Sequence, residues 1–368
     1  MGGRIRSRRV VVIGGGVVGC AVAVELAKAG CAVTLLERDG VASHASRHNA
    51  GKLNPLYATP DALLPLALEA FAAHAALRAE LAAMGCGDFG LQPVTRLFVR
   101  GDSDGDELDH LHGLHERTPG FSSRWLGECD LRAVEPRLTS VATSGLLTQG
   151  ALSVNGEAFT QRLAQAAEQL GATVMCEAAV AVGVTGDRVT QVRTRQGLID
   201  CDAVVFATGP WVADLKSWLG VTVLVRPSSG ALLILRPAGP RLGCDLTCEP
   251  VTFHGRSDGL VCIGAMEHRR EVLSAQETWD RLQSLGSTLV PELAQWEVVD
   301  RVAADRPMTE ANIPIAARAP GWSNAFVANG GGGKGLLLSP LIAQRIGGLV
   351  TGAYVEALGE HLIEEGED

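Results

Sequence analysis

The stretch that decides the fold, residues 8–53, opens with Val10-Val11-Val12-Ile13-Gly14-Gly15-Gly16-Val17-Val18-Gly19. An apolar run with strand character therefore leads directly into a glycine turn. A helical segment (residues 20–29) and a second apolar run (residues 32–36) follow it. Strand, glycine turn, helix and strand are the parts of a βαβ unit that carries G-x-G-x-x-G at its first turn.

Each glycine of this turn has a mechanical reason. Gly14 permits the tight turn, Gly16 lets a pyrophosphate approach the backbone, and Gly19 lets the helix pack against the strand. The helix N-terminus then presents unpaired N–H groups to the phosphates. Glu37 lies 18 residues after Gly19, where its carboxylate can accept ribose hydroxyls. The turn therefore predicts a dinucleotide site that uses Gly14, Gly15, Gly16, Val17, Val18, Gly19 and Glu37, and the alternative is a glycine turn in an ordinary α/β sheet.

The segment after Glu37 resembles the one that follows the ribose-binding acid in flavin enzymes of the D-amino-acid oxidase, glycine oxidase and sarcosine oxidase family. The resemblance implies FAD as the cofactor rather than a nicotinamide dinucleotide. It places a loop of small residues at the pyrophosphate and an Asn-Ala-Gly turn under the flavin ring. The cofactor contacts that it implies here are Arg38, His44, Ala45, Ser46, Arg47, Asn49, Ala50, Gly51 and Leu53.

Composition narrows the class of partner. The chain has 368 residues, 46% hydrophobic and 20% charged, with a net charge of −9. This charge disfavours a nucleic-acid partner, which would call for a basic surface. The nine cysteines are scattered without C-x-x-C, which favours a reduced, cytoplasmic compartment. We expect no membrane span, because we find no continuous apolar run of 18 residues, and we interpret Arg4, Arg6, Arg8 and Arg9 as a solvated leader.

Two patterns suggest metal binding and fail on inspection. Asp102, Asp104 and Asp106 have the spacing of a calcium loop, but Glu107 stands where glycine is required. The histidines at 110, 112 and 115 do not share one helical face, and no carboxylate completes a ligand set. We therefore predict no metal site.

Periodicity and the resemblance together predict a two-part α/β fold. A Rossmann-like FAD-binding domain of the two-dinucleotide type is expected from residues 1–84, 144–222 and 300–368. An inserted, mostly antiparallel β-sheet substrate domain is expected from residues 85–143 and 223–299. Helices are expected at 61–84, with Asp61 as N-cap, at 157–169 and at 276–289.

Two further segments are expected at the cofactor. An apolar strand ends in Ala207-Thr208-Gly209-Pro210-Trp211, which resembles the second nucleotide signature of these flavoproteins. The resemblance implies contacts from Ala207, Thr208, Gly209 and Trp211, and from Val180 on an earlier strand. Near the end of the chain, Gly330-Gly331-Gly332-Gly333-Lys334-Gly335-Leu336 resembles the family's closing glycine loop and helix. That helix would aim its N-terminus at the flavin edge where charge accumulates on reduction; the alternative is an ordinary flexible loop.

The resemblance also implies the chemistry. Family members oxidise a C–N bond beside a carboxylate: the substrate's α-hydrogen passes as hydride to flavin N5, and the imine hydrolyses. Arg306, in the family's R-P-x-T segment, matches the position that holds the substrate carboxylate; a structural ion pair with Asp305 or Glu310 is the alternative. Lys334 is expected to stabilise reduced flavin, assist oxygen chemistry or face solvent. Thr252 stands where relatives present a tyrosine, and His254 is expected on the same strand face.

Departures from the family pattern leave the electron acceptor open. Ala304 replaces the cysteine that tethers flavin in sarcosine oxidases, so FAD is expected to be noncovalent. Cys262 aligns with the oxygen-activating lysine, and Gly333 with a second carboxylate-binding arginine. Oxygen, a quinone or a partner subunit could accept the electrons, and a homo-oligomer is an alternative assembly. We therefore expect a small amino-acid-like substrate, and two alternatives stay open: a 2-hydroxy-acid dehydrogenase, and the flavin subunit of a heteromeric amine, opine or proline dehydrogenase.

Overall fold

A computed structural model describes residues 7–100, 105–265 and 274–366. Arg4, Arg6, Asp102 and Asp104, for which we expected a solvated leader and an acidic turn, lie outside these residues. Within the described residues, two large sheets organise the molecule, one of six strands and one of nine. Two smaller sheets, of three and of two strands, accompany them. The fold is thus the two-part α/β arrangement that the sequence predicts.

The six-stranded sheet has the order β18-β19-β11-β1-β2-β7. Its strands are parallel except for β18, which runs antiparallel to β19. The carboxyl ends of the parallel strands therefore meet along one edge of the sheet. The strand bounds are β1 Arg9–Ile13, β2 Ala32–Leu36, β7 Thr173–Met175, β11 Ala203–Phe206, β18 Ile315–Arg318 and β19 Ala325–Asn329.

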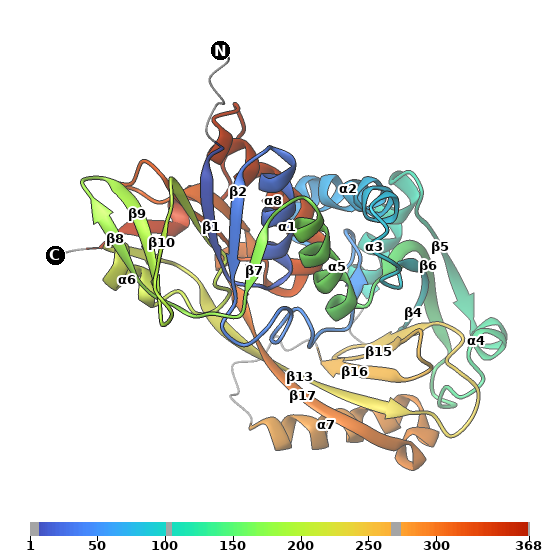
Figure 1. The fold of residues 1–368 in the computed structure, drawn as a ribbon. Coiled ribbons are helices and arrows are strands. Elements are labelled where there is room, and N and C mark those ends of the chain that lie inside the picture. The colour runs from blue at the N-terminus through green and yellow to red at the C-terminus, as the bar shows by residue number, and fades with distance from the viewer. Residues whose placement is uncertain (1–6, 101–104, 266–273, 367–368) are drawn as a thin grey trace.

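This sheet is buried on both faces, which explains why its strands are almost wholly apolar. Val10 and Val12 pack into a core that helices α1, α2, α5 and α8 build, while Val11 and Ile13 pack into a second core on the opposite face. Figure 1 shows the helices to one side of β1 and β2 and the small three-stranded sheet to the other. The helices are α1 Val17–Lys28, α5 Gly156–Gln169 and α8 Gly335–Thr351; the small sheet is β8 Ala179–Thr185, β9 Arg188–Thr194 and β10 Leu198–Asp200.

The glycine turn between β1 and α1 is held by close backbone approaches. The Gly14 N–H donates to the Leu36 carbonyl at 2.8 Å, and Gly14 adopts φ +114°, which a side chain would strain. A Cβ on Gly14 would lie 2.8 Å from the carbonyl carbon of Ala207, and a Cβ on Gly19 would overlap the Gly14 carbonyl oxygen. Gly14 and Gly19 are therefore required by the packing of the turn itself.

The second sheet is mostly antiparallel, as expected, with a single parallel pair, β4 with β14, among its described strands. It extends beyond the segments that we assigned to the substrate domain, because β6, most of β17 and the short β3 also pair into it. The strand bounds are β3 Lys52–Leu53, β4 Gln92–Val99, β5 Ser122–Gly127, β6 Ser144–Ser153, β13 Arg226–Arg236, β14 Asp245–Cys248, β15 Val251–Gly255, β16 Val261–Ala265 and β17 Glu297–Met308.

The boundaries expected at 144 and at 300 therefore do not coincide with the boundary between the sheets. The reason is physical: a strand's pairing partner is set by contacts far away in sequence, and alternation along β6 or β17 does not reveal which sheet it joins. Figure 1 shows β13 and β17 side by side, as a long two-stranded extension of the nine-stranded sheet towards the six-stranded sheet.

The helix expected at 61–84 is present as a 3₁₀ turn, Asp61–Leu63, followed by α2, Leu64–Ala83. The N-cap prediction was wrong, because Asp61 is the first residue of the 3₁₀ turn and Leu63 occupies the N-cap of α2. The buried face of α2 packs against α8, where His74 Nε2 lies 3.0 Å from the Leu337 carbonyl oxygen. Burial lowers the pKa of His74 to about 4, so this ring is neutral and can donate that bond.

One helical stretch among the described residues, Asp61–Ala83, is long and apolar enough to cross a membrane, judged by length and composition alone. We expected no such segment because we looked for an unbroken apolar run, and here alanines alternate with Glu69, Arg78 and Glu80. One such helix is weak evidence for a span, since the core helix of a folded domain passes the same test. The residues that α2 buries, Ala67, Ala70, His74, Leu77 and Leu81, recur at helical spacing along a single face.

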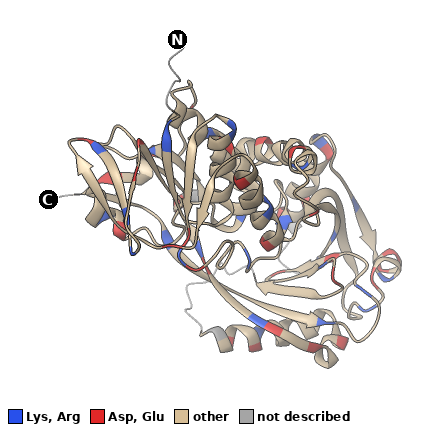
Figure 2. Cartoon of the chain, viewed as in Figure 1, with Lys and Arg blue, Asp and Glu red and all other residues tan. Residues whose placement is uncertain are grey.

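Shorter elements complete the fold. Helix α7 begins with a capping box in which Ser274 and Glu277 bond each other's backbone N–H groups. Lysines, arginines and acids are interspersed along the ribbon in Figure 2. The remaining bounds are α3 Gly105–Arg117, α4 Glu128–Val134, α6 Asp214–Leu219, α7 Ala275–Leu289, β12 Val221–Val223 and β20 Ile363–Glu365.

The close approach at Gly19 leads to a prediction about stability. Gly19→Ala should lower the free energy of unfolding by about 1–3 kcal/mol or more, because the new methyl group overlaps a backbone carbonyl that cannot move alone. Gly16→Ala is the matched control: its Cβ would meet only the Ser46 hydroxyl at 3.2 Å, so its cost should stay below about 1 kcal/mol. Urea unfolding followed by circular dichroism measures both, and equal losses would contradict this assignment.

Candidate active site

A cavity of about 790 Å³ runs between the carboxyl edge of the six-stranded sheet and one face of the nine-stranded sheet. Each parallel strand of the six-stranded sheet is followed by a loop that lines this cavity. The loops that follow β1, β2, β7, β11 and β19 supply Gly14, Glu37, Glu177, Thr208 and Gly331 respectively. The cavity is therefore built by the topological rule for open α/β sheets, in which ligands bind at the carboxyl ends of the strands.

At one end of the cavity, Glu37 organises the loop that follows β2. Its two carboxylate oxygens accept the N–H groups of Gly15 at 2.6 Å and Asp39 at 2.9 Å. Beside it, the rings of His44 and Trp211 lie 4.6 Å apart, and the Arg38 guanidinium lies 4.2 Å from the Trp211 ring centroid. A carboxylate next to a partly exposed aromatic ring suits the ribose and base of a nucleotide.

The middle of the cavity is lined by the N-terminus of α1 and the small-residue loop. The Ser46 hydroxyl accepts the Val17 N–H at 2.9 Å, so this loop lies directly over the first turn of α1. Asn49 folds the loop back, because its side chain donates to the Ser46 carbonyl at 2.7 Å and accepts the Gly51 N–H at 2.8 Å. Gly16 lines the cavity at the first turn of α1, so its backbone is exposed to a pyrophosphate bound there.

The far end is formed by the glycine loop and the N-terminus of α8. The space beside Gly333 and Gly335 is open, since a Cβ on either would meet no atom within 4 Å. An open glycine backbone and a helix N-terminus fit the polar edge of a flavin. Elsewhere in the cavity lining, after β11, the Thr208 hydroxyl is buried without a hydrogen-bond partner in the protein, which leaves a donor for a bound ligand. The residues present therefore fit FAD from one end of the cavity to the other.

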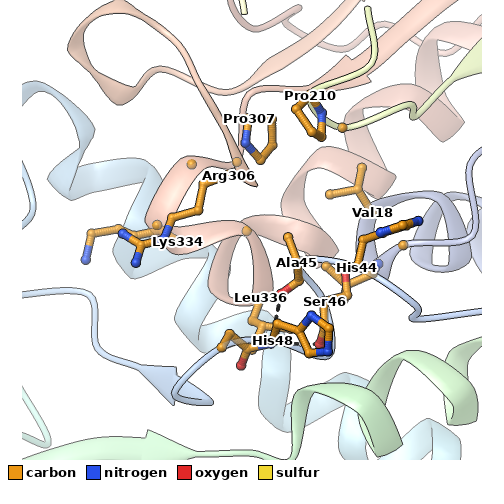
Figure 3. A pocket seen from close by; sticks show the side chains of 18 of the residues that line it. Val18, His44, Ala45, Ser46, His48, Pro210, Arg306, Pro307, Lys334 and Leu336 are labelled. Carbon is orange, nitrogen blue, oxygen red and sulfur yellow. Dashed lines mark hydrogen bonds between the residues drawn. The ribbon is translucent and has the colours of Figure 1, made fainter. Parts of the chain in front are cut away.

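Most of the residues expected at the cofactor line this cavity. They are Gly14, Gly16, Val17, Val18, Glu37, Arg38, His44, Ala45, Ser46, Asn49, Ala50, Gly51, Ala207, Thr208, Gly209, Trp211, Arg306, Gly331, Gly332, Gly333, Lys334, Gly335 and Leu336. Figure 3 shows several of them around the cavity, with Val18 and the residues His44 to Ser46 on one side and Arg306 and Lys334 on the other.

Six of the expected residues are not among those that line it: Gly15, Gly19, Arg47, Leu53, Val180 and Gly330. Their roles in the structure are different. Gly19 serves the packing of the turn, Leu53 is buried in the core, and Arg47 pairs with Glu157 at 3.4 Å. Val180 is 42% exposed, and the neighbouring Ala179 lines the cavity instead, because an offset of one residue along a strand reverses the side-chain direction.

The Lys334 side chain lines the cavity and connects two segments of its wall. Its ammonium donates to the carbonyls of Asn54 at 3.1 Å and Tyr57 at 2.9 Å, joining the glycine loop to the segment that follows β3. Burial, together with the positive charge of Arg96, lowers the pKa of Lys334 to about 7. The side chain therefore changes charge near neutral pH.

The nine-stranded sheet contributes a buried polar cluster that sequence reasoning found only in part. Thr252 and His254 lie on the same strand face, as expected, with His254 Nε2 3.0 Å from the Thr252 hydroxyl. His254 Nδ1 lies 3.1 Å from an Asp245 oxygen, and Lys52 and Arg96 contact the same carboxylate at 3.1 and 3.4 Å. The sequence analysis missed Lys52, Arg96 and Asp245. Each is a charged residue within a short strand, which is a usable signal, but their convergence depends on the pairing of β4 with β14.

The charges of this cluster follow from burial. Burial and the nearby cations lower the pKa of His254 to about 4, although Asp245 opposes the shift, so the imidazole is neutral. Burial acts to raise the pKa of Asp245, but the His254 hydrogen bond and the Lys52 charge outweigh it and hold that pKa far below its usual range. The pKa of Lys52 is lowered by burial and partly restored by Asp245.

Arg306 lies on β17, opposite Ser228 of β13. Its guanidinium lies over Gly230, where any side chain would collide with it, and it lines the cavity at the glycine-loop end. Neighbouring Asp305 accepts a hydrogen bond from the Ser229 hydroxyl. Figure 3 shows Arg306 extending in the same direction as Lys334.

One group of potential metal ligands occurs among the described residues. Single donor atoms of Glu37, Asp39 and His44 lie within 4.8 Å of one another. Asp39 pairs with His44 at 2.8 Å and with Arg38 at 2.8 Å, and Glu37 accepts two backbone N–H groups. The group is empty, and its oxygens are occupied by protein donors.

Comparison with known proteins agrees with this geometry. The model of the DAO family, described as FAD dependent oxidoreductase, matches residues 9–349. A glycine oxidase of Geobacillus kaustophilus is 31% identical over 357 residues, which cover 93% of this chain and 92% of that protein. A glycine oxidase of Pseudomonas aeruginosa is 28% identical over 354 residues, 94% of this chain and 95% of that protein.

The crystal structure of glycine oxidase from Geobacillus kaustophilus has a TM-score of 0.84 against this structure. It is 27% identical in sequence, and the match covers 95% of this chain and 97% of that one. The likeness thus extends over both sheets and the cavity between them. Because the family model spans nearly the whole chain, this protein belongs to the DAO family of FAD-dependent oxidoreductases.

Proposed function

We propose that this protein oxidises the C–N bond of an amino acid or N-substituted amino acid, with Arg306 holding the substrate carboxylate. The observation that carries the proposal is the position of Arg306 in the cavity, at the end that the glycine loop forms. Relatives named glycine oxidase, which match this chain over nearly its full length, support the same class of substrate. FAD supplies the two-electron acceptor when it is bound; the chain's residues bind and orient the substrate.

The surroundings of Arg306 favour recognition of a planar anion. Gly230 leaves open the space over β13 that the guanidinium occupies, so the arginine is held by the sheet rather than by a loop. A guanidinium can present two parallel N–H groups to a carboxylate, which fixes orientation as well as position. A carboxylate held in this way would keep the substrate's Cα at a fixed place in the cavity.

Lys334 has a second role in this proposal. When protonated, its ammonium places a positive charge at the glycine loop, beside the N-terminus of α8, and both favour electron transfer to a bound flavin. The same ammonium holds Asn54 and Tyr57 in place through their carbonyls. The two roles of Lys334 can be separated by substitution. An arginine at this position would replace the positive charge but not the hydrogen bonds to the carbonyls of Asn54 and Tyr57.

Electrons from the reduced flavin pass to an acceptor. Oxygen, a quinone or a partner subunit could accept the electrons. Turnover with oxygen in the isolated protein would exclude an obligatory partner subunit. Turnover of 2-hydroxy acids without turnover of amino acids would favour the hydroxy-acid alternative instead.

Arg306→Ala should reduce kcat/KM for a carboxylate substrate by about 10- to 100-fold, mainly through KM, because a charge-assisted hydrogen bond is lost. Arg306→Lys should recover only part of the loss, since Lys lacks the planar fork. The matched control is Arg301→Ala, which removes an exposed arginine from the same strand. Steady-state kinetics with FAD content measured in parallel checks this, and an unchanged KM in Arg306→Ala would reject the carboxylate role.

Lys334 should make the midpoint potential of the bound FAD depend on pH. Its pKa is lowered to about 7, so its charge is present below that pH and lost above it. At pH 6 the midpoint potential of the wild type should exceed that of Lys334→Met by about 30 mV, which corresponds to an interaction of about 1.4 kcal/mol between the Lys334 charge and the reduced flavin. Above pH 8 the two midpoint potentials should become equal. Lys334→Arg should keep the higher potential throughout. A difference that is constant from pH 6 to 8.5 in spectroelectrochemical titrations would assign Lys334 to anchoring alone.

FAD should be bound noncovalently. The position where sarcosine oxidases carry a tethering cysteine is Ala304, and none of the chain's nine cysteines, all of them described, lines the cavity. Precipitation of the purified protein with acid should release the yellow cofactor into the supernatant. Colour that stays in the pellet after the protein is unfolded would show a covalent link.

A further inference from the structure

The buried cluster on the nine-stranded sheet holds two basic side chains and one acidic side chain. Lys52 and Arg96 share the single carboxylate of Asp245, at 3.1 and 3.4 Å, and all three side chains are at least nine-tenths buried. His254, the fourth member, is neutral by the argument above. Glu249 is the nearest other acid described, but its carboxylate accepts the Tyr57 hydroxyl at 3.0 Å and does not line the cavity.

Arg96 is also incompletely bonded. Its Nη2 contacts Asp245 at 3.4 Å and His254 Nδ1 at 3.3 Å, both long for hydrogen bonds. Its Nε is buried with no hydrogen-bond partner in the protein. A buried, unsatisfied donor on a charged group is costly, and a native site that keeps one calls for an explanation. Lys52 also donates to the Gly255 carbonyl at 3.2 Å, and the Arg96 guanidinium lies 5.3 Å from the Tyr57 ring centroid. These contacts do not use the buried Nε donor of Arg96.

Acidic and basic side chains line opposite ends of the cavity. Its lining acids, Glu37, Glu177 and Asp214, lie on the loops and helix at the nucleotide end. The substrate end is lined by four cations and by no acid among the described residues: Lys52, Arg96, Arg306 and Lys334. Arg306 and Lys334 have roles in the proposed function, which leaves Lys52 and Arg96 over a single buried counter-ion.

The register of the sheet places the two arginines on either side of one row of residues. Thr252, Gly264 and Leu232 are directly paired neighbours on β15, β16 and β13 and line the cavity. The Arg306 guanidinium lies over Gly230, one row to one side, and Arg96 contacts His254, one row to the other. The anchor residues Gly230 and His254 lie two strands apart and four residues apart along the strands, or roughly 16 Å from each other in the sheet. Gly264 adds no side chain to the floor between them, so a short molecule can lie there.

We infer that the substrate carries a second carboxylate, at the end remote from the one that Arg306 holds, and that Arg96 and Lys52 recognise it. The inference rests on the proposed function for the first carboxylate and extends it to a substrate class, the dicarboxylic amino acids. The second carboxylate can be borne by the side chain, as in glutamate, or by the nitrogen substituent, as in N-(carboxymethyl)glycine. Arg96 and Lys52 would together supply donors to it.

The test compares matched pairs that differ in one charge. Kinetics of the FAD-loaded wild type is measured with D- and L-glutamate against D- and L-glutamine, and with N-(carboxymethyl)glycine against N-isobutylglycine. Binding is measured independently by the change in melting temperature and in flavin absorbance with glutarate against pentanoate. We expect the charged member to be favoured at least about tenfold in one kinetic pair and in the binding pair. The kinetic pair that shows the preference identifies the end of the substrate that bears the second carboxylate.

Three variants assign the effect to residues. Arg96→Gln should abolish the preference for the charged member within each pair, and Arg96→Lys should restore part of that preference. Lys52→Met, which leaves Asp245 paired with Arg96, is the second variant should Arg96→Gln fail to fold. Arg100→Gln, at an exposed arginine just beyond β4, is the control and should keep the full preference.

Two outcomes would overturn the second-carboxylate inference and leave the proposed function standing. The first is that, in every pair, the charged member is oxidised and bound no better than its uncharged partner. The second is that the preference for the charged member survives in both Arg96→Gln and Lys52→Met. Failure of wild-type holoenzyme to oxidise any amino acid overturns the proposed function. In that case, tighter binding of glutarate than pentanoate, lost in Arg96→Gln, still supports a dianion site at Arg96 and Lys52.

Discussion

The parallel pairing of β1 with β2 on one side and β11 on the other is the constraint on which the site depends. It brings the glycine turn, Glu37 and the Ala207 loop to one edge of the sheet, although they are separated by up to about 190 residues of sequence. The fit is tight, because Gly14 and Gly19 leave no room for a side chain beside Ala207 or beside each other. Small residues at these positions are therefore a condition for forming the sheet and the cradle together.

The part of the fold that the sequence predicts is the part that local chemistry determines. The βαβ unit and the helices expected at 157–169 and 276–289, which are α5 and α7 in the structure, each follow from residues within a few positions of one another. The membership of β6 and β17 in the second sheet could not be predicted in this way, since pairing across long separations leaves no mark on either strand alone.

The same division holds for the site. Residues carried by contiguous motifs, such as the loop from His44 to Gly51 and the glycine loop before α8, line the cavity as expected. Lys52 stands next to one of those motifs and was passed over, and Arg96 and Asp245 lie 149 residues apart. Their meeting is a consequence of strand register, which physical reasoning from one sequence does not supply. A charged residue inside a short apolar strand is the signal that would have directed attention to them.

The tie between Lys334 and the carbonyls of Asn54 and Tyr57 has a consequence for biosynthesis. The cradle for the first half of the ligand is encoded near residue 14, but β19, the glycine loop and α8 are translated about 300 residues later. Helix α8 also covers α1 and α2, so the nascent N-terminal half carries an uncovered apolar surface until α8 has been translated. Flavin capture therefore requires both halves of the polypeptide, and termination before residue 325 would remove β19, the glycine loop and α8 from the core and from the cavity.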